Sequence, residues 1–270
     1  MLSNLRSVIS VNRIRLHFGF ILSKHMLHYA IVAFIASIIN AYIVIPSILE
    51  EIVMLSVKTP YAPVMAPTRF IGLSLNLAHL IFSIVSLSMA SSMARELSTT
   101  SLFHLSQPIK RLEYALSWLF AITLLPSVLM ALSLFVPVAS FDPRLVLRVG
   151  FQPIYLRIVE DFLVFSIFCW AALSKRQGIV AFVGLFFILI FPYLSLVLFS
   201  LIYYVLRAKI ALNFLFMVYE VIFPSTAYSF LQGSGLLALD PMKASYGTLA
   251  ISVAIQMLYL LHFTRRFEVR

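Results

Sequence analysis

The sequence is dominated by long apolar runs, several of which have the length of a helix that crosses a lipid bilayer. A helix rises about 1.5 Å per residue, so about 20 apolar residues are needed to cross a hydrocarbon core of roughly 30 Å. Lipid cannot hydrogen-bond to exposed backbone groups, and none of the runs alternates polar and apolar residues as barrel strands do. The sequence therefore predicts an all-α integral membrane protein, with residues 1–270 forming one transmembrane domain.

The composition indicates lipid rather than water as the main solvent of this chain. Hydrophobic residues make up 62% of the sequence and charged residues 11%, whereas a soluble domain needs about 25% charged residues to cover its surface. We therefore expect a lipid membrane around the protein, and the net charge of +10 does not indicate a nucleic-acid partner. The single cysteine, Cys169, excludes a disulfide within this sequence and a cysteine-based metal site.

Six apolar runs are predicted to be transmembrane helices. They cover residues 26–48, 70–92, 114–138, 156–173, 179–206 and 246–263. The fourth run is interrupted by charge, and it reaches across the bilayer only if Glu160 and Asp161 lie in the membrane interface. Prolines predict a break at Pro46 and a kink at Pro126, and residues 50–69 are predicted to form a proline-marked loop.

Two further segments are expected at the membrane surfaces. Residues 1–25 mix cations with apolar residues, which is typical of a basic amphipathic helix lying in the headgroup plane; a partly disordered basic leader is the alternative. Residues 209–230 are apolar but contain Asn213, Glu220 and Pro224. This second segment is either a seventh crossing or a segment that enters and leaves the membrane on one face.

The distribution of charge distinguishes these two topologies. With six crossings, the side that holds both ends of the chain carries twelve Lys and Arg residues against three acids, and the opposite side carries eight against seven. The positive-inside rule assigns the basic side to the cytoplasm. Seven crossings would place the basic tail after residue 263 outside. We therefore expect a multi-pass plasma-membrane protein with six spans, cytoplasmic termini, and an outer re-entrant or interfacial segment over residues 209–230.

The polar segment 93–113, between the second and third spans, carries the most informative pattern. Glu96 follows the second span directly, the Ser and Thr residues at 98–101 offer helix N-caps, and Pro108 ends the helix. Its apolar face consists of Leu102, Phe103 and Leu105. A short cytoplasmic amphipathic helix of this kind suits docking into a groove on a partner, and an interfacial linker is the alternative.

The same segment resembles the cytoplasmic coupling region of the type-2 ABC exporter permeases. That family shows an acid, then Gly-Thr, a leucine-rich turn and a proline-containing entry into the third span. The matching residues here are Glu96, Thr100, Leu102, Phe103, Leu105, Pro108, Ile109 and Arg111. The sequence departs from the pattern at Thr99, where the family usually has glycine, and at Lys110, where it usually has a small polar residue. The predicted N-terminal helix, six spans, re-entrant segment and basic tail also resemble this family.

The resemblance implies a permease subunit without an enzymatic site, which dimerises with itself or with a homologue. Two separate nucleotide-binding ATPase subunits would bind ATP and Mg, and this chain would bind no cofactor. The residues implied to couple to the ATPase are Glu96, Thr99, Thr100, Leu102, Phe103, Leu105, Pro108 and Arg111. The sequence contains no nucleotide-binding loop of the form GxxxxGK[ST]. The export direction is implied by the family alone, and the substrate stays open.

Acids within apolar surroundings leave two other functions open. An ion- or proton-coupled secondary transporter would use Glu220 or the Glu160–Asp161 pair as its coupling group, because an ionisable residue within a membrane segment is a functional candidate. Glu220 alternatively lies near the outer headgroups and pairs with Arg207 or Lys209. A membrane-embedded scaffold is the remaining possibility.

Two polar residues lie within the second predicted span. Asn76 and His79 are candidates for lining a transport path, and helix-to-helix hydrogen bonding is the alternative use of both. His25 and His28 share one helix face, but their place at the start of the first span favours an interfacial polar pair over a metal site.

Overall fold

The computed structural model describes residues 10–23, 27–58, 66–99, 111–141, 151–191, 209–231 and 239–266, together with the single positions 194, 197, 198 and 201. All regular structure in these ranges is helical, and the predicted all-α class is confirmed. The elements are α2 (Val11–Ile21), α3 (Leu27–Lys58), α4 (Ala66–Thr99), α6 (Arg111–Leu119), the π-helical turn η2 (Phe120–Leu124), α7 (Leu125–Phe141), α9 (Phe151–Ala172), α10 (Gln177–Leu185), the π-helical turn η4 (Phe186–Ile190), α12 (Lys209–Ile222), α13 (Pro224–Leu231) and α14 (Pro241–Arg266).

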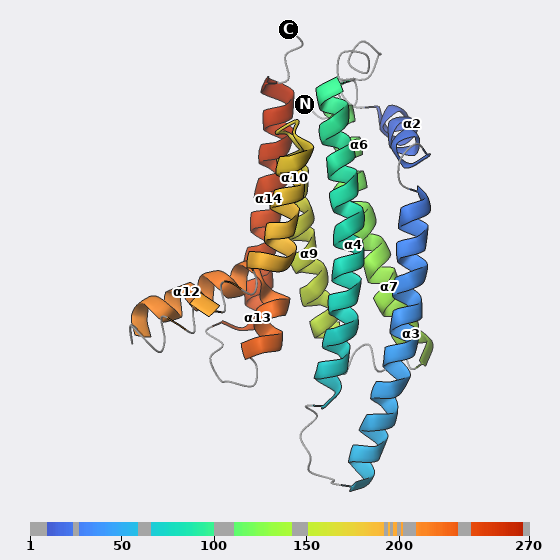
Figure 1. The fold of residues 1–270 in the computed structure, drawn as a ribbon, viewed down its shortest axis with the longest axis vertical. Helices are drawn as coiled ribbons and strands as arrows, with labels where there is room; N and C mark the ends of the chain where they lie inside the picture. The colour runs from blue at the N-terminus through green and yellow to red at the C-terminus, as the bar shows by residue number, and fades with distance from the viewer. Residues whose placement is uncertain are drawn as a thin grey trace.

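The long helices form one bundle around α9, which contacts α4, α7, α10, α13 and α14. In Figure 1, α3, α4, α6 with α7, α9, α10 and α14 run side by side and alternate in direction along the chain. α12 extends sideways from the bundle at the end where α14 begins, and α2 lies at the opposite end beside α6. The end of α4, the start of α6 and the end of α14 therefore lie at the same end of the bundle.

Three helices in the described part of the chain have the length and apolar composition to cross a membrane. They are Ser74–Ser98, Arg111–Pro137 and Pro241–Arg265. Shorter apolar helical stretches occur at Leu27–Ile43, Gln177–Ile190 and Asn213–Ile222. α9 is long enough, but it carries Arg157, Glu160 and Asp161, and these charges set it apart from the three apolar helices.

The interior of the bundle is built on one face of α4 that packs against α9. Buried positions on α4 recur every three or four residues, the spacing that places side chains on one side of a helix. They include Ala78, Phe82, Val85, Met89, Met93 and Leu97. Phe165, Phe168 and Cys169 of α9 belong to the same buried cluster. Large apolar side chains on α3, α10 and α14 face outward instead, as expected of surfaces that contact lipid.

Helix ends differ from the sequence prediction in three places. α3 continues through Pro46 to Lys58 and α4 begins at Ala66, so the predicted loop over residues 50–69 is helical at both ends. Half of the residues from Ser47 to Lys58 are Leu, Glu, Met or Lys, which are good helix formers and support the continuation of α3. α9 begins at Phe151 rather than near residue 156, because the proline at its third position is compatible with a first helical turn. The turn after α9 occupies residues 173–176, and α10 begins at Gln177, two residues before the predicted start of the fifth span at residue 179.

The π-helical turn η2 lies directly upstream of Pro126, the position at which the sequence predicts a kink. The backbone N–H that follows η2 donates to the carbonyl of Phe120, five residues earlier. A proline has no N–H and its ring clashes with the carbonyl four residues before it, and a wider turn just upstream relieves that clash. η4 has the same construction ahead of Pro192, with the N–H of Phe191 donating to the carbonyl of Phe186.

Gly184 marks a close approach of α10 to α4. A β-carbon at this position would clash with Cδ1 of Leu87 and lie 2.6 Å from Cδ2. We expect Gly184→Ala to cost about 1 kcal/mol of unfolding free energy, because the end of Leu87 must shift within a filled interface. Thermal unfolding of the purified protein in lipid nanodiscs measures the change. Gly178→Ala is the matched control, since its β-carbon would meet nothing within 4 Å; equal losses in both variants would contradict the prediction.

Candidate functional site

Three charged residues on α9 face the interior of the bundle. Arg157, Glu160 and Asp161 share one helix face because positions three and four residues apart are neighbours, and their exposed fractions are 4%, 1% and 0%. The sequence predicts Glu160 and Asp161 in the membrane interface; in the structure both side chains are buried within the protein, where α9 meets α4 and α13. Buried charges are tolerated only when they are paired or hydrogen-bonded, so their contacts define the site.

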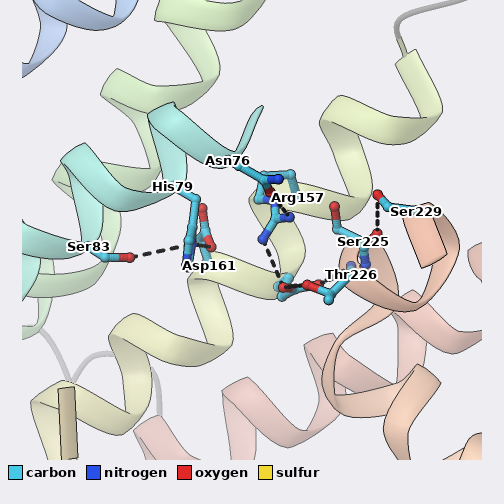
Figure 2. A network of polar contacts seen from close by, with 9 residues as sticks. Asn76, His79, Ser83, Arg157, Asp161, Ser225, Thr226 and Ser229 are labelled. Atoms are coloured by element: carbon cyan, nitrogen blue, oxygen red, sulfur yellow. Dashed lines mark hydrogen bonds and ion pairs between the residues drawn. The ribbon is translucent and has the colours of Figure 1, made fainter. Parts of the chain in front are cut away.

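Arg157 connects α9 to α4. Its Nη1 donates to Oε1 of Glu160 at 2.9 Å, and its Nη2 donates to Oδ1 of Asn76 at 2.8 Å. Figure 2 shows Asn76 and Arg157 pointing toward each other from neighbouring helices. Asn76 is thus used for helix-to-helix hydrogen bonding, the alternative that the sequence left open.

Glu160 caps the N-terminus of α13. Its Oε2 accepts the backbone N–H groups of Ser225 and Thr226 at 2.8 and 2.9 Å, and its Oε1 accepts the hydroxyl of Thr226 at 2.6 Å. The first N–H groups of a helix have no partner within that helix, and the helix dipole favours a negative charge there. α13 begins with Pro224, a residue suited to the first helical position. Glu160 therefore supplies, from another helix, the cap that α13 needs.

His79 and Asp161 make a second connection between α4 and α9. Nδ1 of His79 lies 2.5 Å from Oδ1 of Asp161, and the hydroxyl of Ser83 lies 3.5 Å from the same nitrogen. Figure 2 shows His79 and Asp161 side by side, with Ser83 on the far side of the histidine. Oδ2 of Asp161 is buried without a hydrogen-bond partner. We refer to the buried residues His79, Arg157, Glu160 and Asp161, together with the exposed Asn76 that hydrogen-bonds to Arg157, as the buried ionic network.

A second cluster joins the end of α4 to the start of α6. Glu96 is 6% exposed, and its Oε2 accepts a hydrogen bond from the hydroxyl of Tyr114 at 3.3 Å. Glu113, which directly precedes Tyr114 in the sequence, is also buried. Its Oε1 accepts the backbone N–H of Ser10, at the start of α2, at 2.7 Å. The ring of Tyr114 also packs against rings of α2 and α14, with centroid distances of 4.8 and 5.7 Å. We refer to Glu96, Glu113 and Tyr114 as the α4–α6 junction.

The residues predicted to couple to an ATPase are described only in part. Thr99 is the last residue of α4 and Arg111 is the first residue of α6. Thr100, Leu102, Phe103, Leu105 and Pro108 lie outside the described residues. Glu96 is buried and accepts a hydrogen bond from the hydroxyl of Tyr114.

Glu220, the third candidate for a transport path, is buried on α12. Its Oε2 accepts the backbone N–H of Leu239 at 2.8 Å, a contact that links α12 to the residue pair preceding α14. The side chains of Arg207 and Lys209, which the sequence suggests as partners, lie outside the described part of the chain. Glu220 thus has a structural contact of its own, distinct from those of Asn76 and His79.

Sequence reasoning missed Arg157 as the centre of the buried ionic network and Glu113 as an anchor of α2. Opposite charges three residues apart within an apolar run were the available signal for the Arg157–Glu160 pair. No comparable signal exists for Glu113, whose partner Ser10 lies 103 residues away in the sequence.

The described ranges contain no group of three or more His, Cys, Asp and Glu residues that could hold a metal ion. No protein-family model, curated protein or solved structure matches this chain. The interpretation of function therefore depends on the buried ionic network, the α4–α6 junction and the sequence pattern between α4 and α6.

Proposed function

We propose that this chain is the transmembrane permease subunit of an ATP-driven ABC exporter. Six helical segments would cross the plasma membrane with both termini in the cytoplasm, and α12 with α13 would form an outer re-entrant segment. The observation that carries the proposal is the α4–α6 junction. Its buried side chains tie the helices on both sides of the predicted coupling segment to the rest of the bundle.

A force applied to residues 100–110 enters the bundle through the end of α4 and the start of α6. The start of α6 is bound to α2 through Ser10 and Glu113, and to α14 through the hydroxyl of Tyr259, which donates to the carbonyl of Ala115 at 3.2 Å. Densely packed helices shift as units rather than deforming continuously. A displacement of the segment would therefore move α2, α4, α6 and α14 together. A segment that served only as an interfacial linker would not need these connections to the bundle.

The arrangement of the helices supports the six-span topology. α4 ends, α6 begins and α14 ends at one end of the bundle (Figure 1). The three apolar helices would be joined as spans by α3, by α9 and by the segment that begins with α10. α9 would cross the membrane despite its charges, because Arg157 and Glu160 have hydrogen-bonding partners inside the protein. The break between α12 and α13 at Phe223 is consistent with a segment that turns back.

Separate subunits would supply the chemistry of this transporter. ATP and Mg would bind to two nucleotide-binding ATPase subunits, and a second permease copy or a homologue would complete the membrane part. Closure of the ATPase pair would pass through residues 96–111 into α4 and α6. The substrate class stays open, because the outward faces of α3, α10 and α14 carry large apolar side chains and no outer domain occurs among the described residues.

Copurification tests the proposal. The tagged full-length chain, solubilised from its native membranes in mild detergent, should copurify an ATPase subunit. Phe103→Asp should reduce the retained ATPase about tenfold, equivalent to about 1.4 kcal/mol, because a charge on an apolar docking face opposes binding in a hydrophobic groove. Tyr61→Asp, in the predicted outer loop, is the matched control.

Two outcomes would contradict the exporter proposal. The first is a wild-type chain that purifies without an ATPase, or a Phe103→Asp variant that retains it fully. The second is transport in membrane vesicles that survives ATP depletion and collapses with the proton gradient. That second result would support an ion-coupled secondary transporter instead.

A further inference from the structure

We propose that His79 and Asp161 together form a binding site for one proton, and that the bound proton clamps α4 to α9. This inference does not depend on the exporter proposal. It starts from the charges within the buried ionic network. Arg157 neutralises Glu160, with which it forms an ion pair at 2.9 Å. Asp161 then remains as a buried carboxylate, and His79 is its only hydrogen-bonding partner among the described residues.

The charge count requires one additional proton. With His79 neutral and Asp161 ionised, the network would carry one uncompensated negative charge in the interior of the bundle. Removing one partner of a buried ion pair costs about 3–5 kcal/mol, which indicates how unfavourable such a charge is. One proton shared by the histidine and the carboxyl group makes the network neutral. Nδ1 and Oδ1 lie 2.5 Å apart, so a proton on either atom is within hydrogen-bonding distance of the other.

Among the described residues, no further charged group hydrogen-bonds or pairs with His79 or Asp161. α13 contributes backbone N–H groups and the Thr226 hydroxyl, and all of these are directed to Glu160. The helices packed on α4 and α9 carry other titratable groups in their described parts, but none of these hydrogen-bonds or pairs with His79 or Asp161. They include Tyr29 and Tyr42 of α3, Tyr114 of α6, Tyr228 of α13, and Lys243, Tyr246, Tyr259 and His262 of α14.

The two members of the pair differ in their access to the outside. The side chain of Asp161 is 0% exposed, whereas that of His79 is 11% exposed. The histidine is therefore the route by which a proton enters or leaves the carboxylate. Because α4 and α9 each contribute one member, a change in their separation alters the site, and proton binding in turn favours their contact. The ligand of this site is a proton, and the element that it controls is the α4–α9 interface.

Nitrogen NMR of histidine tests the site directly. The full-length protein, labelled with ¹⁵N-histidine and placed in lipid nanodiscs, is measured at neutral pH, and the His79 signal is assigned by its loss in His79→Gln. We expect either an imidazolium signal or an Nδ1 signal shifted by a shared proton. In Asp161→Asn the signal should revert to that of neutral imidazole, because the network is then neutral without the proton. His28→Gln, which removes an exposed histidine of α3, should leave the His79 signal unchanged.

A second measurement keeps the proposal testable where a variant folds poorly. Hydrogen exchange of α4 amides should be about tenfold faster in His79→Gln than in wild type, and close to wild type in the neutral pair His79→Gln/Asp161→Asn. Ordinary neutral imidazole signals from His79 in the wild-type protein would overturn the proposal. So would α4 exchange that is unchanged in His79→Gln. None of these readouts involves the ATPase, so they fail or succeed separately from the copurification experiment.

Discussion

Replacing Glu160 with alanine is expected to destabilise the folded protein by about 3–5 kcal/mol, the typical cost of removing one partner of a buried ion pair. The substitution leaves the Arg157 guanidinium buried with only Asn76 as a partner. It also removes the acceptor for the N–H groups of Ser225 and Thr226, so α13 loses its cap. Thermal unfolding in lipid nanodiscs and amide exchange of α13 should both report the loss.

A charge-balanced variant and an exposed cap serve as the comparisons for Glu160→Ala. Arg157→Met/Glu160→Gln removes both charges, and it should be more stable than either single substitution because no unpaired charge remains. Asp240→Ala removes an exposed cap, whose Oδ1 accepts the N–H of Met242 at 2.8 Å, and it should cost only about 1 kcal/mol. Equal losses in Glu160→Ala and Asp240→Ala would show that burial of the Arg157–Glu160 pair has no energetic role.

Replacing Glu113 with alanine is expected to release α2 from the bundle, at a cost of roughly 2 kcal/mol. Glu113 is fully buried and accepts the N–H of Ser10 at 2.7 Å, and a hydrogen bond to a charged group contributes about 1.5–3 kcal/mol. Other contacts of α2 include a ring contact with Tyr114, a weak hydrogen bond from the Ser117 hydroxyl to the carbonyl of Ile14 at 3.3 Å, and the packing of Ile21 in the core. Amide exchange of α2 should rise well before the whole protein unfolds.

Glu113→Gln provides the conservative comparison for this release. The glutamine keeps a carbonyl oxygen that can accept the Ser10 N–H, so α2 should stay docked and its exchange should remain near the wild-type rate. If α2 exchanges at the same rate in the wild-type protein and in Glu113→Ala, the anchor assigned to Glu113 does not exist. The exporter proposal would then lose one of the connections through which the coupling segment acts on the bundle.

The two clusters divide the bundle into parts with different expected roles. The α4–α6 junction lies at the end where α4 stops and α6 starts, and the proposed exporter receives its driving movement there. The buried ionic network connects α4, α9 and α13 through Asn76, Glu160 and Asp161. α4 takes part in both clusters. A movement of α4 at the α4–α6 junction would therefore displace Asn76 and His79 relative to their partners on α9.

The residue pattern within each segment predicted the helices, but it did not predict the contacts of the buried ionic network. The apolar runs predicted the helical class, and Pro126 predicted an irregular helix where η2 occurs. The same reasoning predicted a break at Pro46 and a loop from residue 50, because proline followed by acids resembles a helix stop, whereas α3 continues to Lys58. It did not predict that Glu160 and Asp161 are buried against other helices, because an isolated helix has no means of compensating two buried carboxylates.

Bilayer thickness and the need to satisfy every backbone hydrogen bond act on each segment by itself, so run length and residue order determine where this chain is helical. Which charge meets which partner depends on distances between helices that are far apart in the sequence. Arg157 and Asn76 are 81 residues apart, Asp161 and His79 are 82 apart, and Glu113 and Ser10 are 103 apart. Only the packing of α4, α9, α13 and α2 brings these groups together, because a buried charge is stable only where the tertiary structure supplies its partner.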